Sequence, residues 1–362
     1  MNEANLPDRG MIPDGRTMEH QQGLDQLARH VLEKGLCASC GACVGGCPYL
    51  TSFRGRTVIL DRCTVENGRC FTYCPMTFFD AEETGRFVFG TSYDGKSGIG
   101  NAQEVIATKA VDVKTASEGQ GGGTVSALTA LAMEKGLIDA AILTGILPGD
   151  TFPHGVLAAT VPEILACGGS RYVGAHGLTA LGEALRRGYR RIGVVGLPCQ
   201  VRSLRKMALY DLRREDLKDR IALVIGLFCN WAFSSRDFTA FLAARFDLNE
   251  IKRFHIPPPP ANILELETIQ GPAGIPLDEL RPMIQAACGV CPDMTSEFAD
   301  ISVGMYEGRE GWNTAIVRTD AGRGLFETAI ATKAIEVEPF PEVNRSHLRQ
   351  ASNKKKERSS GI

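Results

Sequence analysis

Four cysteines within one short run constrain this chain more than any other feature of its sequence. Three thiolates at two-residue intervals can wrap three corners of a four-iron cubane, whereas a fourth after a longer step points to a second cluster. A structural zinc site usually needs only paired C-x-x-C units, so zinc is the weaker interpretation. The run is Cys37-x2-Cys40-x2-Cys43-x3-Cys47-Pro48, in which Gly41 helps the tight wrap and the proline redirects the chain.

A second cysteine segment, Cys63-x6-Cys70-x3-Cys74-Pro, follows the first. Together the two segments resemble a two-cluster bacterial ferredoxin, in which Cys74 would complete the cluster of Cys37, Cys40 and Cys43, and Cys47 would join Cys63 and Cys70. The second set is then one thiolate short. We expect a [3Fe-4S] cluster there, or a [4Fe-4S] cluster completed by an oxygen ligand, for which Glu66 and Asn67 are the nearest donors. A single cluster in this region is the simpler alternative.

The five remaining cysteines lie further along the chain, at Cys167, Cys199, Cys229, Cys288 and Cys291. Cys199 and Cys229 each follow a predicted strand, and the ends of adjacent parallel strands meet at one edge of a sheet. With the Cys288-x-x-Cys291 pair they would form a third metal centre of four thiolates. Burial as small hydrophobic residues is an equal alternative from spacing alone. Cys167 has no cysteine neighbour within thirty residues, and we assign it a structural role.

Composition explains why metal is the preferred role for so many cysteines. The chain has 362 residues, 44% of them hydrophobic, and its net charge of −2 gives no reason to expect nucleic-acid binding. The longest uncharged apolar stretch, residues 221–233, is too short to span a membrane, and the polar N-terminus has no signal-peptide pattern. We therefore expect a cytoplasmic protein without a membrane span, in a compartment where disulfides seldom persist.

The sequence divides into five parts. Residues 1–30 form a polar extension that ends in a helix, with Leu24, Leu27 and Val31 on one face. Residues 31–85 form a small ferredoxin-like α+β iron-sulfur module, and residues 86–104, rich in Gly and Ser, form a linker. Residues 105–340 form an α/β domain with a largely parallel or mixed sheet. The basic residues 341–362 are expected to be a disordered tail.

Alternating strands and helices define the α/β domain. The pattern predicts strands at 138–144 and 191–196, helices at 178–187 and 200–209, and a strand at 221–229 that is buried on both faces. The prolines at 257–260 predict an extended surface loop.

A glycine-rich loop precedes a predicted helix that starts near Val125. Its backbone N–H groups and the helix N-terminus suit a pyrophosphate, although the loop is neither a dinucleotide fingerprint nor a nucleotide-triphosphate loop, and a flexible turn is the alternative. The preceding segment, 111–117, is a weak predicted strand. The loop residues are Ser117, Gly119, Gln120, Gly121, Gly122, Gly123 and Thr124. No catalytic acid, base or nucleophile is predicted, and His154, His176 and His255 are expected to be ordinary surface or core residues.

With these motifs assembled, the chain resembles the beta subunit family of coenzyme F420 hydrogenases and dehydrogenases, a set of iron-sulfur flavoproteins. The matching features, over roughly residues 30–330, are the glycine loop, Gly196-x-Pro198-Cys199-Gln200, residues 225–229, Cys288-x-x-Cys291-x-Asp293, residues 299–304, residues 311–314 and Arg318-Thr319. The resemblance implies that FAD is held by the glycine loop together with Pro198 and Gln200. It also implies that Cys199, Cys229, Cys288 and Cys291 hold a [4Fe-4S] cluster near the flavin.

The function implied by this resemblance is hydride exchange between coenzyme F420 and FAD, with electrons passed through two to three iron-sulfur clusters to a partner subunit. The expected partners are hydrogenase, formate dehydrogenase or disulfide-reductase-type subunits in a heteromeric complex. Two alternatives stay open: a ferredoxin- or NAD(P)H-linked flavin reductase of the same fold acting on another acceptor, and a flavin-free electron-relay subunit.

Overall fold

The computed structural model describes residues 23–65, 68–119, 121–146, 152–212, 216–257 and 260–360. The predicted oxygen ligands Glu66 and Asn67, the loop residue Gln120 and most of the polar extension lie outside these residues. The predicted extended loop at 257–260 is described only at its two ends.

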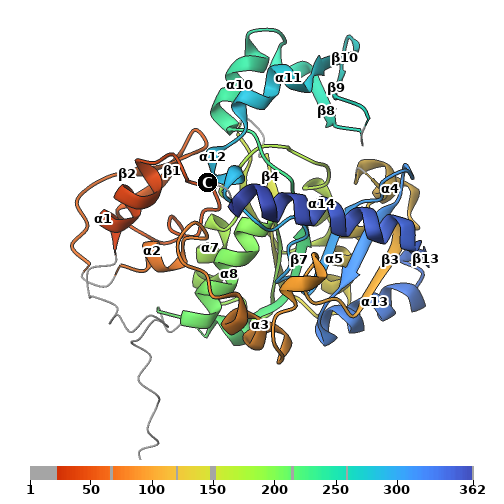
Figure 1. Cartoon of the computed structure of the whole chain (residues 1–362), viewed down its shortest axis with the longest axis horizontal. Coiled ribbons are helices and arrows are strands. Elements are labelled where there is room, and N and C mark those ends of the chain that lie inside the picture. The colour runs from red at the N-terminus through yellow and green to blue at the C-terminus, as the bar shows by residue number, and fades with distance from the viewer. Residues whose placement is uncertain are drawn as a thin grey trace, which may run out of the picture.

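An eight-stranded mixed sheet forms the centre of the molecule (Figure 1). Its strand order is β13-β3-β12-β11-β7-β6-β4-β5. The four neighbouring strands β11, β7, β6 and β4 are parallel, and the pairs toward both edges are antiparallel. A mixed α/β sheet was one of the two predicted forms and is confirmed. The strands are β3 (Glu104–Ala110), β4 (Ala140–Gly145), β5 (His154–Ala158), β6 (Ile192–Gly196), β7 (Ile221–Leu227), β11 (Ile301–Met305), β12 (Asn313–Val317) and β13 (Ile335–Pro339).

Helices cover both faces of this sheet. In β7, Val224 packs with α7 and α8, whereas its neighbours Leu223 and Ile225 pack with α5, α6 and α13. Because both faces are covered, the strand is apolar at consecutive positions, as predicted. The helices and strands predicted at 138–144, 178–187, 191–196 and 200–209 are present, with ends within two residues of the prediction. The helices are α5 (Thr124–Glu134), α6 (Val161–Ala166), α7 (Thr179–Arg186), α8 (Pro198–Tyr210), α9 (Leu217–Arg220) and α13 (Asp320–Ala331).

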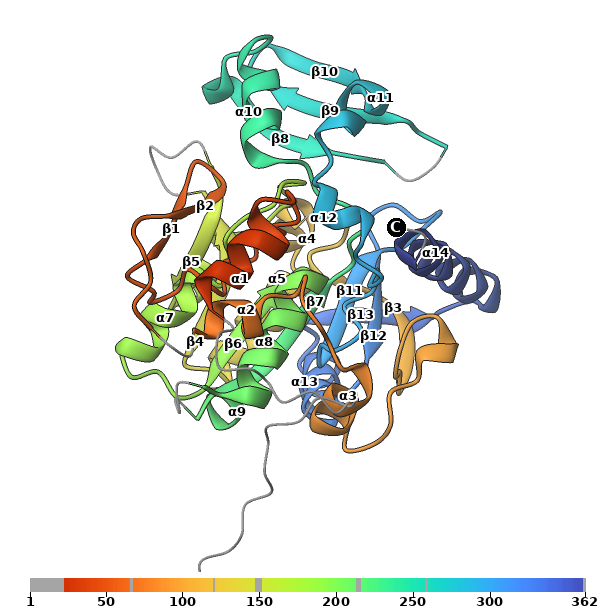
Figure 2. The same cartoon turned by 60° about the vertical axis from the view of Figure 1, so that its left-hand side comes forward.

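The N-terminal cysteines lie in a small α+β module beside α8 (Figure 2). Leu24, Leu27 and Val31 share a buried face, as predicted, and pack with Leu50 and several of the cysteines. Since the module has few apolar residues, the cysteine side chains make up much of its interior. Its elements are α1 (Leu24–Leu27), a π-helical turn (Ala28–Leu32), the hairpin of β1 (Leu50–Phe53) and β2 (Arg56–Ile59), and α2 (Arg69–Tyr73).

The predicted linker at 86–104 begins too early. Residues 86–89 are the last residues of α3 (Ala81–Phe89), which starts where the Asp80 carboxylate accepts a hydrogen bond from the Glu83 N–H. Gly90, at φ +69°, ends the helix. The capping aspartate and the terminating glycine therefore define a helix that the Gly and Ser content of the segment obscured.

The weak strand predicted at 111–117 is also wrong. The segment forms α4 (Val113–Glu118), and Asp112 caps it by accepting a hydrogen bond from the Thr115 N–H at 2.7 Å. The capping bond outweighs the alternating valines that suggested a strand.

A second, three-stranded antiparallel sheet stands apart from the central sheet (Figures 1 and 2). Its core contains Phe233, Phe238 and Leu280, with Leu264 and Leu266 from β9. Sequence analysis did not predict it, although the alternation of these two leucines with glutamates is a strand signal. The elements are α10 (Ser235–Ala243), β8 (Ile251–His255), β9 (Ile263–Thr268), β10 (Gly271–Pro276) and α11 (Leu277–Leu280).

The prediction of a disordered tail is wrong for residues 342–360. They form α14 (Glu342–Ser360), which packs on the domain through a few buried residues, among them Ser352 and Lys355. The low apolar content of the segment predicted disorder, but this helix is held on the domain mainly by polar contacts. In the described part of the chain, no helix has the length and apolar character needed to cross a membrane.

Candidate functional site

Four cysteines that are distant in sequence line one cavity of the α/β domain. Cys199 lies at the start of α8, just after β6, and Cys229 lies just after β7. Because β6 and β7 are adjacent and parallel, the two thiols meet at the same edge of the sheet. Cys288, in the short helix α12 (Ala286–Gly289), and Cys291 complete the lining, together with Pro198 and Lys355. The convergence expected from strand order is therefore present. We call these four residues the embedded cysteine set.

The embedded thiols are poorly solvated. Burial raises the pKa of Cys229 to about 12 and that of Cys199 well above its ordinary value. The Cys288 sulfur accepts a hydrogen bond from the Ala232 N–H at 3.3 Å, although burial still raises its pKa. Without a bound metal, Cys199, Cys229 and Cys288 are neutral thiols at pH 7, so metal binding would release protons.

Four thiols are a donor set that suits an iron-sulfur cluster as well as a single zinc ion. Among the described residues, no group of three or more His, Cys, Asp or Glu side chains is arranged to hold one metal ion. In a four-iron cubane each thiolate binds a different iron atom, so its four ligands stand further apart than the ligands of one ion. The four embedded thiols line one cavity but do not all point at a single position, and such a set is compatible with the ligands of a cubane.

The module cysteines are close enough to influence one another, and we divide them into two groups by their strongest neighbours. The pKa of Cys40 is raised to about 12, mainly by burial and in part by the nearby Cys74 and Cys37. Burial also raises the pKa of Cys43 well above its ordinary value, with Cys40 and Cys37 as its strongest cysteine neighbours. Cys74 therefore lies near Cys37 and Cys40, and its pairing with the first three cysteines stays a prediction. We call these four residues the inner set.

The second group contains Cys47, Cys63 and Cys70, which we call the outer set. Burial raises the pKa of Cys70 to about 11, and Cys47 and Cys63 are its nearest thiol neighbours. The Cys63 sulfur accepts a hydrogen bond from the Val65 N–H at 3.4 Å. The fourth ligand predicted for this set, Glu66 or Asn67, lies outside the described residues.

The inner set lies next to the embedded set. Among the neighbouring thiols, Cys40 contributes most strongly to raising the pKa of Cys199, and Ala38 and Met76 of the module also line the embedded cavity. A Cβ on Gly41, at φ +88°, would stand 2.8 Å from the His176 carbonyl oxygen, so glycine permits this close approach. The three sets therefore follow one another in the order embedded, inner and outer.

Lys206 on α8 fastens the module to the α/β domain. It is buried, and its Nζ donates hydrogen bonds to the carbonyl oxygens of Cys74 and Phe78 and to the Thr77 hydroxyl, at 2.7 to 2.8 Å. Burial lowers the pKa of Lys206 to about 7, whereas the neighbouring Cys74 opposes this shift. Sequence analysis missed this residue, because a lysine in a helix gives no sign of which loop will cover it.

The glycine loop borders a cavity of about 1050 Å³, at the upper end of the range for small-molecule sites. Ser117, Gly121 and Gly122 form one side, and the sheet β8–β10 and the loop 305–312 form the others. The charged lining residues are mixed in sign: Arg253, Arg309, Glu265, Glu267 and Glu310, with His255 beside them. Thus His255, expected to be an ordinary surface or core residue, lies at the cavity wall.

Asn313 positions this loop. Its Oδ1 accepts a hydrogen bond from the Thr124 N–H at 3.3 Å, and its Nδ2 donates to the Gly304 carbonyl at 3.1 Å. The adjacent Trp312 lies between two cations, with Lys109 Nζ 4.7 Å and Arg309 Cζ 3.9 Å from the ring centroid. Both residues belong to the quoted motif at 311–314, but sequence analysis gave them no role.

Several predicted cofactor residues do not line this large cavity. A Cβ on Gly119 or Gly123 would overlap the Thr115 carbonyl oxygen, so both glycines serve the packing of α4 against α5. Gln200 is buried, with its amide bonded to the Ala175 carbonyl and the Leu197 N–H, and Pro198 lines the embedded cysteine cavity instead. Of the described predicted loop residues, Ser117, Gly121 and Gly122 face the cavity.

Comparison with known proteins places these features in a family. The model described as Coenzyme F420 hydrogenase/dehydrogenase, beta subunit N-term, matches residues 105–182, and the corresponding C-terminus model matches residues 189–343. Coenzyme F420 hydrogenase subunit beta of Methanosarcina barkeri is 31% identical over 68% of this chain and 84% of its own length. The protein of the same name from Methanothermobacter thermautotrophicus is 29% identical over 72% of this chain and 94% of its own length.

A solved structure agrees with these matches. A chain of the F420-reducing [NiFe] hydrogenase complex from Methanosarcina barkeri superposes with a TM-score of 0.68 and 30% identity, covering 73% of this chain and 91% of that chain. The two family models include the glycine loop and the embedded cysteine set, whereas the inner and outer sets precede them. The chain is therefore an oxidoreductase that belongs to the coenzyme F420 hydrogenase/dehydrogenase beta subunit family.

Proposed function

We propose that the chain exchanges hydride between coenzyme F420 and a bound FAD, and that its three cysteine sets relay electrons to a partner subunit. The observation that carries this proposal is the arrangement of a dinucleotide-sized cavity and three successive thiol sets in one chain of this family. A flavin supplies the conversion between two-electron hydride chemistry and one-electron transfer. The protein's part is to position and shield the reacting groups.

The residues around the large cavity fit a dinucleotide. Gly121 and Gly122, at φ +80° and +112°, present backbone without side chains at the cavity wall, close to the N-terminus of α5. This region would hold the pyrophosphate, and the Arg253 guanidinium on the opposite wall would add positive charge. The aromatic and apolar lining residues, Trp312, Met305 and Phe254 among them, would exclude water from the ring system.

Adjacent strands connect the cavity to the first thiol set. Met305, at the end of β11, lines the large cavity, and Cys229 follows β7, the parallel neighbour of β11. The Phe228 N–H donates to the Val303 carbonyl at 2.9 Å, which ties the two strand ends together. The embedded set would hold a [4Fe-4S] cluster at this edge, followed by the inner and outer sets toward the surface of the module.

The surface around the outer set suits a docking partner. Next to Cys63, Leu60 and Val65 are 60% and 49% exposed, and Arg62 is exposed as well. Exposed apolar side chains beside arginines are typical of protein interfaces. Here the partner would be a hydrogenase, formate dehydrogenase or disulfide-reductase-type subunit that exchanges electrons with the outer set.

The test is anaerobic purification with quantification of iron and flavin, followed by mixing with F420H2 or NADPH. We expect one flavin and roughly eight to twelve iron atoms per chain, with bleaching of the visible flavin absorption by F420H2 alone. Bleaching by NADPH alone would assign the chain to another hydride donor. Iron without flavin would leave an electron-relay subunit and refute the hydride step.

A further inference from the structure

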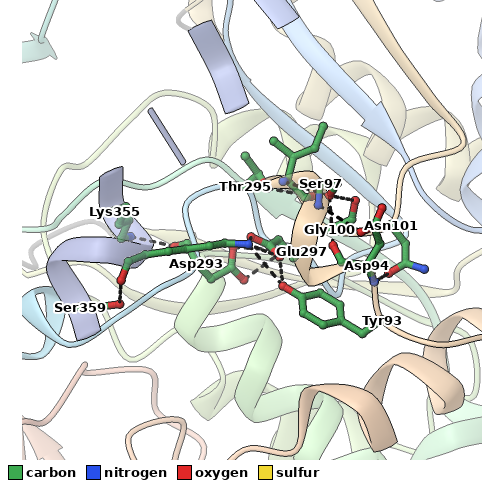
Figure 3. A network of polar contacts seen from close by, with 12 residues as sticks. Tyr93, Asp94, Ser97, Gly100, Asn101, Asp293, Thr295, Glu297, Lys355 and Ser359 are labelled. Atoms are coloured by element: carbon green, nitrogen blue, oxygen red, sulfur yellow. Dashed lines mark hydrogen bonds and ion pairs between the residues drawn. The ribbon is translucent and has the colours of Figure 1, made fainter. Parts of the chain in front are cut away.

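The helix α14 lies almost wholly beyond residue 343, where the match to the family ends. It has very few apolar residues, so the hydrophobic effect alone does not explain why it packs on the domain. Figure 3 shows Lys355 and Ser359 of this helix on one side of a polar network that extends through Asp293 and Glu297 to Tyr93. Leu348 packs on a hydrophobic cluster, and the other contacts described for the helix are mainly polar.

One of these contacts compensates a buried charge. The Glu297 side chain is only 2% exposed, and the Lys356 ammonium lies 2.8 Å from its Oε1. Tyr93 donates a hydrogen bond to the same carboxylate. Leaving a buried carboxylate with less compensating positive charge is costly, so the Lys356 ion pair favours the docked position of α14.

The neighbouring lysine reaches the embedded cysteine set. Lys355 is 3% exposed, lines the cavity of the four thiols, and donates hydrogen bonds to the carbonyl oxygens of Cys229 at 2.6 Å and Asp293 at 2.8 Å. Arg358, one turn further on, donates to the Asn230 carbonyl at 3.5 Å. The helix thus adds positive charge to a site built from four thiols.

We propose that α14 is an electrostatic clamp on the embedded cysteine set and that Lys355 is the positioning residue which sets the reduction potential of the cluster held there. This inference rests on the proposed function, because it requires a cluster at that site. A cluster with four thiolate ligands is anionic and gains one further negative charge on reduction. A fixed ammonium beside it stabilises the reduced form and therefore raises the potential. The carbonyl contacts also hold the backbone on either side of the set.

The test compares single substitutions in the full-length protein by potentiometric titration monitored by electron paramagnetic resonance. The signal of the embedded cluster is first identified as the one that disappears in Cys288→Ser. We expect Lys355→Met to shift the midpoint potential of this signal to more negative values and Lys355→Arg to restore it. The matched control is Lys354→Met, which removes the same charge from the exposed neighbouring position and should leave the potential unchanged.

If Lys355→Met assembles no cluster, Lys355→Gln is titrated instead, since glutamine keeps a donor and loses only the charge. An unchanged potential in both neutral variants, or an equal shift in Lys354→Met, would overturn the proposal. Failure of the proposed function has a different signature: Cys288→Ser would then leave the iron content and all resonance signals as in the unmodified protein.

Discussion

Replacing Asn313 with leucine tests whether this side chain sets the shape of the glycine loop. The amide bonds the first turn of α5 through the Thr124 N–H and bonds the end of β11 through the Gly304 carbonyl. Leucine has a similar volume but can make neither bond. We expect Asn313→Leu to weaken FAD binding more than it weakens the fold.

The magnitude follows from the burial of the two partners. Thr124 is fully buried, so its unsatisfied N–H costs about 1–3 kcal/mol, whereas the partly exposed Gly304 carbonyl can bond water and costs about 1 kcal/mol. The total loss of unfolding free energy is about 2–4 kcal/mol. If about 2 kcal/mol of this loss is the free energy needed to order the glycine loop when FAD binds, FAD affinity falls about thirtyfold.

The assay is fluorescence titration of the flavin-free protein with FAD, alongside denaturant unfolding. Ser302→Ala is the matched control, because it also removes two buried hydrogen bonds, to the Ser296 carbonyl and from Arg318 Nε, and Ser302 does not line the cavity. It should lower stability by a similar amount without changing FAD affinity. Equal FAD affinity in both variants would refute the role assigned to Asn313.

Three further predictions concern pH, docking and iron. His176 is buried, and burial lowers its pKa to about 4 from 6.5. The unfolded state therefore binds more protons below about pH 6.5, and the free energy of unfolding falls by about 2 kcal/mol between about pH 7.5 and pH 5. The variant His176→Gln should weaken this pH dependence in urea unfolding, and an unchanged pH dependence would contradict the prediction. Lys206→Met loses three hydrogen bonds and should lower the free energy of unfolding by about 3 kcal/mol or more. The control Lys218→Met changes an exposed lysine and should lower it by almost nothing. Similar values for the two variants would rule out a role of Lys206 in holding the module on the α/β domain. Cys70→Ser should remove only the iron of the outer set and leave flavin bleaching by F420H2 intact. Loss of all iron in this variant would contradict the prediction that the outer set holds a separate cluster.

The sequence by itself determined the local features of this protein. The cysteine spacings predict that Cys74 pairs with the first three cysteines, because closely spaced ligands and tight turns are properties of short segments. Strand order was enough to bring Cys199 and Cys229 to one edge of the sheet. The consecutive apolar residues of 221–227 likewise identified a strand covered on both faces.

Only the tertiary structure decided which distant residues serve these sites. Nothing local to Lys206, Asn313 or Lys355 indicates what each side chain will contact, since each has a partner at least 62 residues away along the chain. The tail was misread for the same reason: its few apolar residues predicted disorder, whereas its lysines find a buried carboxylate and backbone carbonyls that exist only after the domain has folded. Polar contacts between distant segments depend on geometry that no local pattern of residues encodes, and in this protein those contacts complete the candidate redox sites.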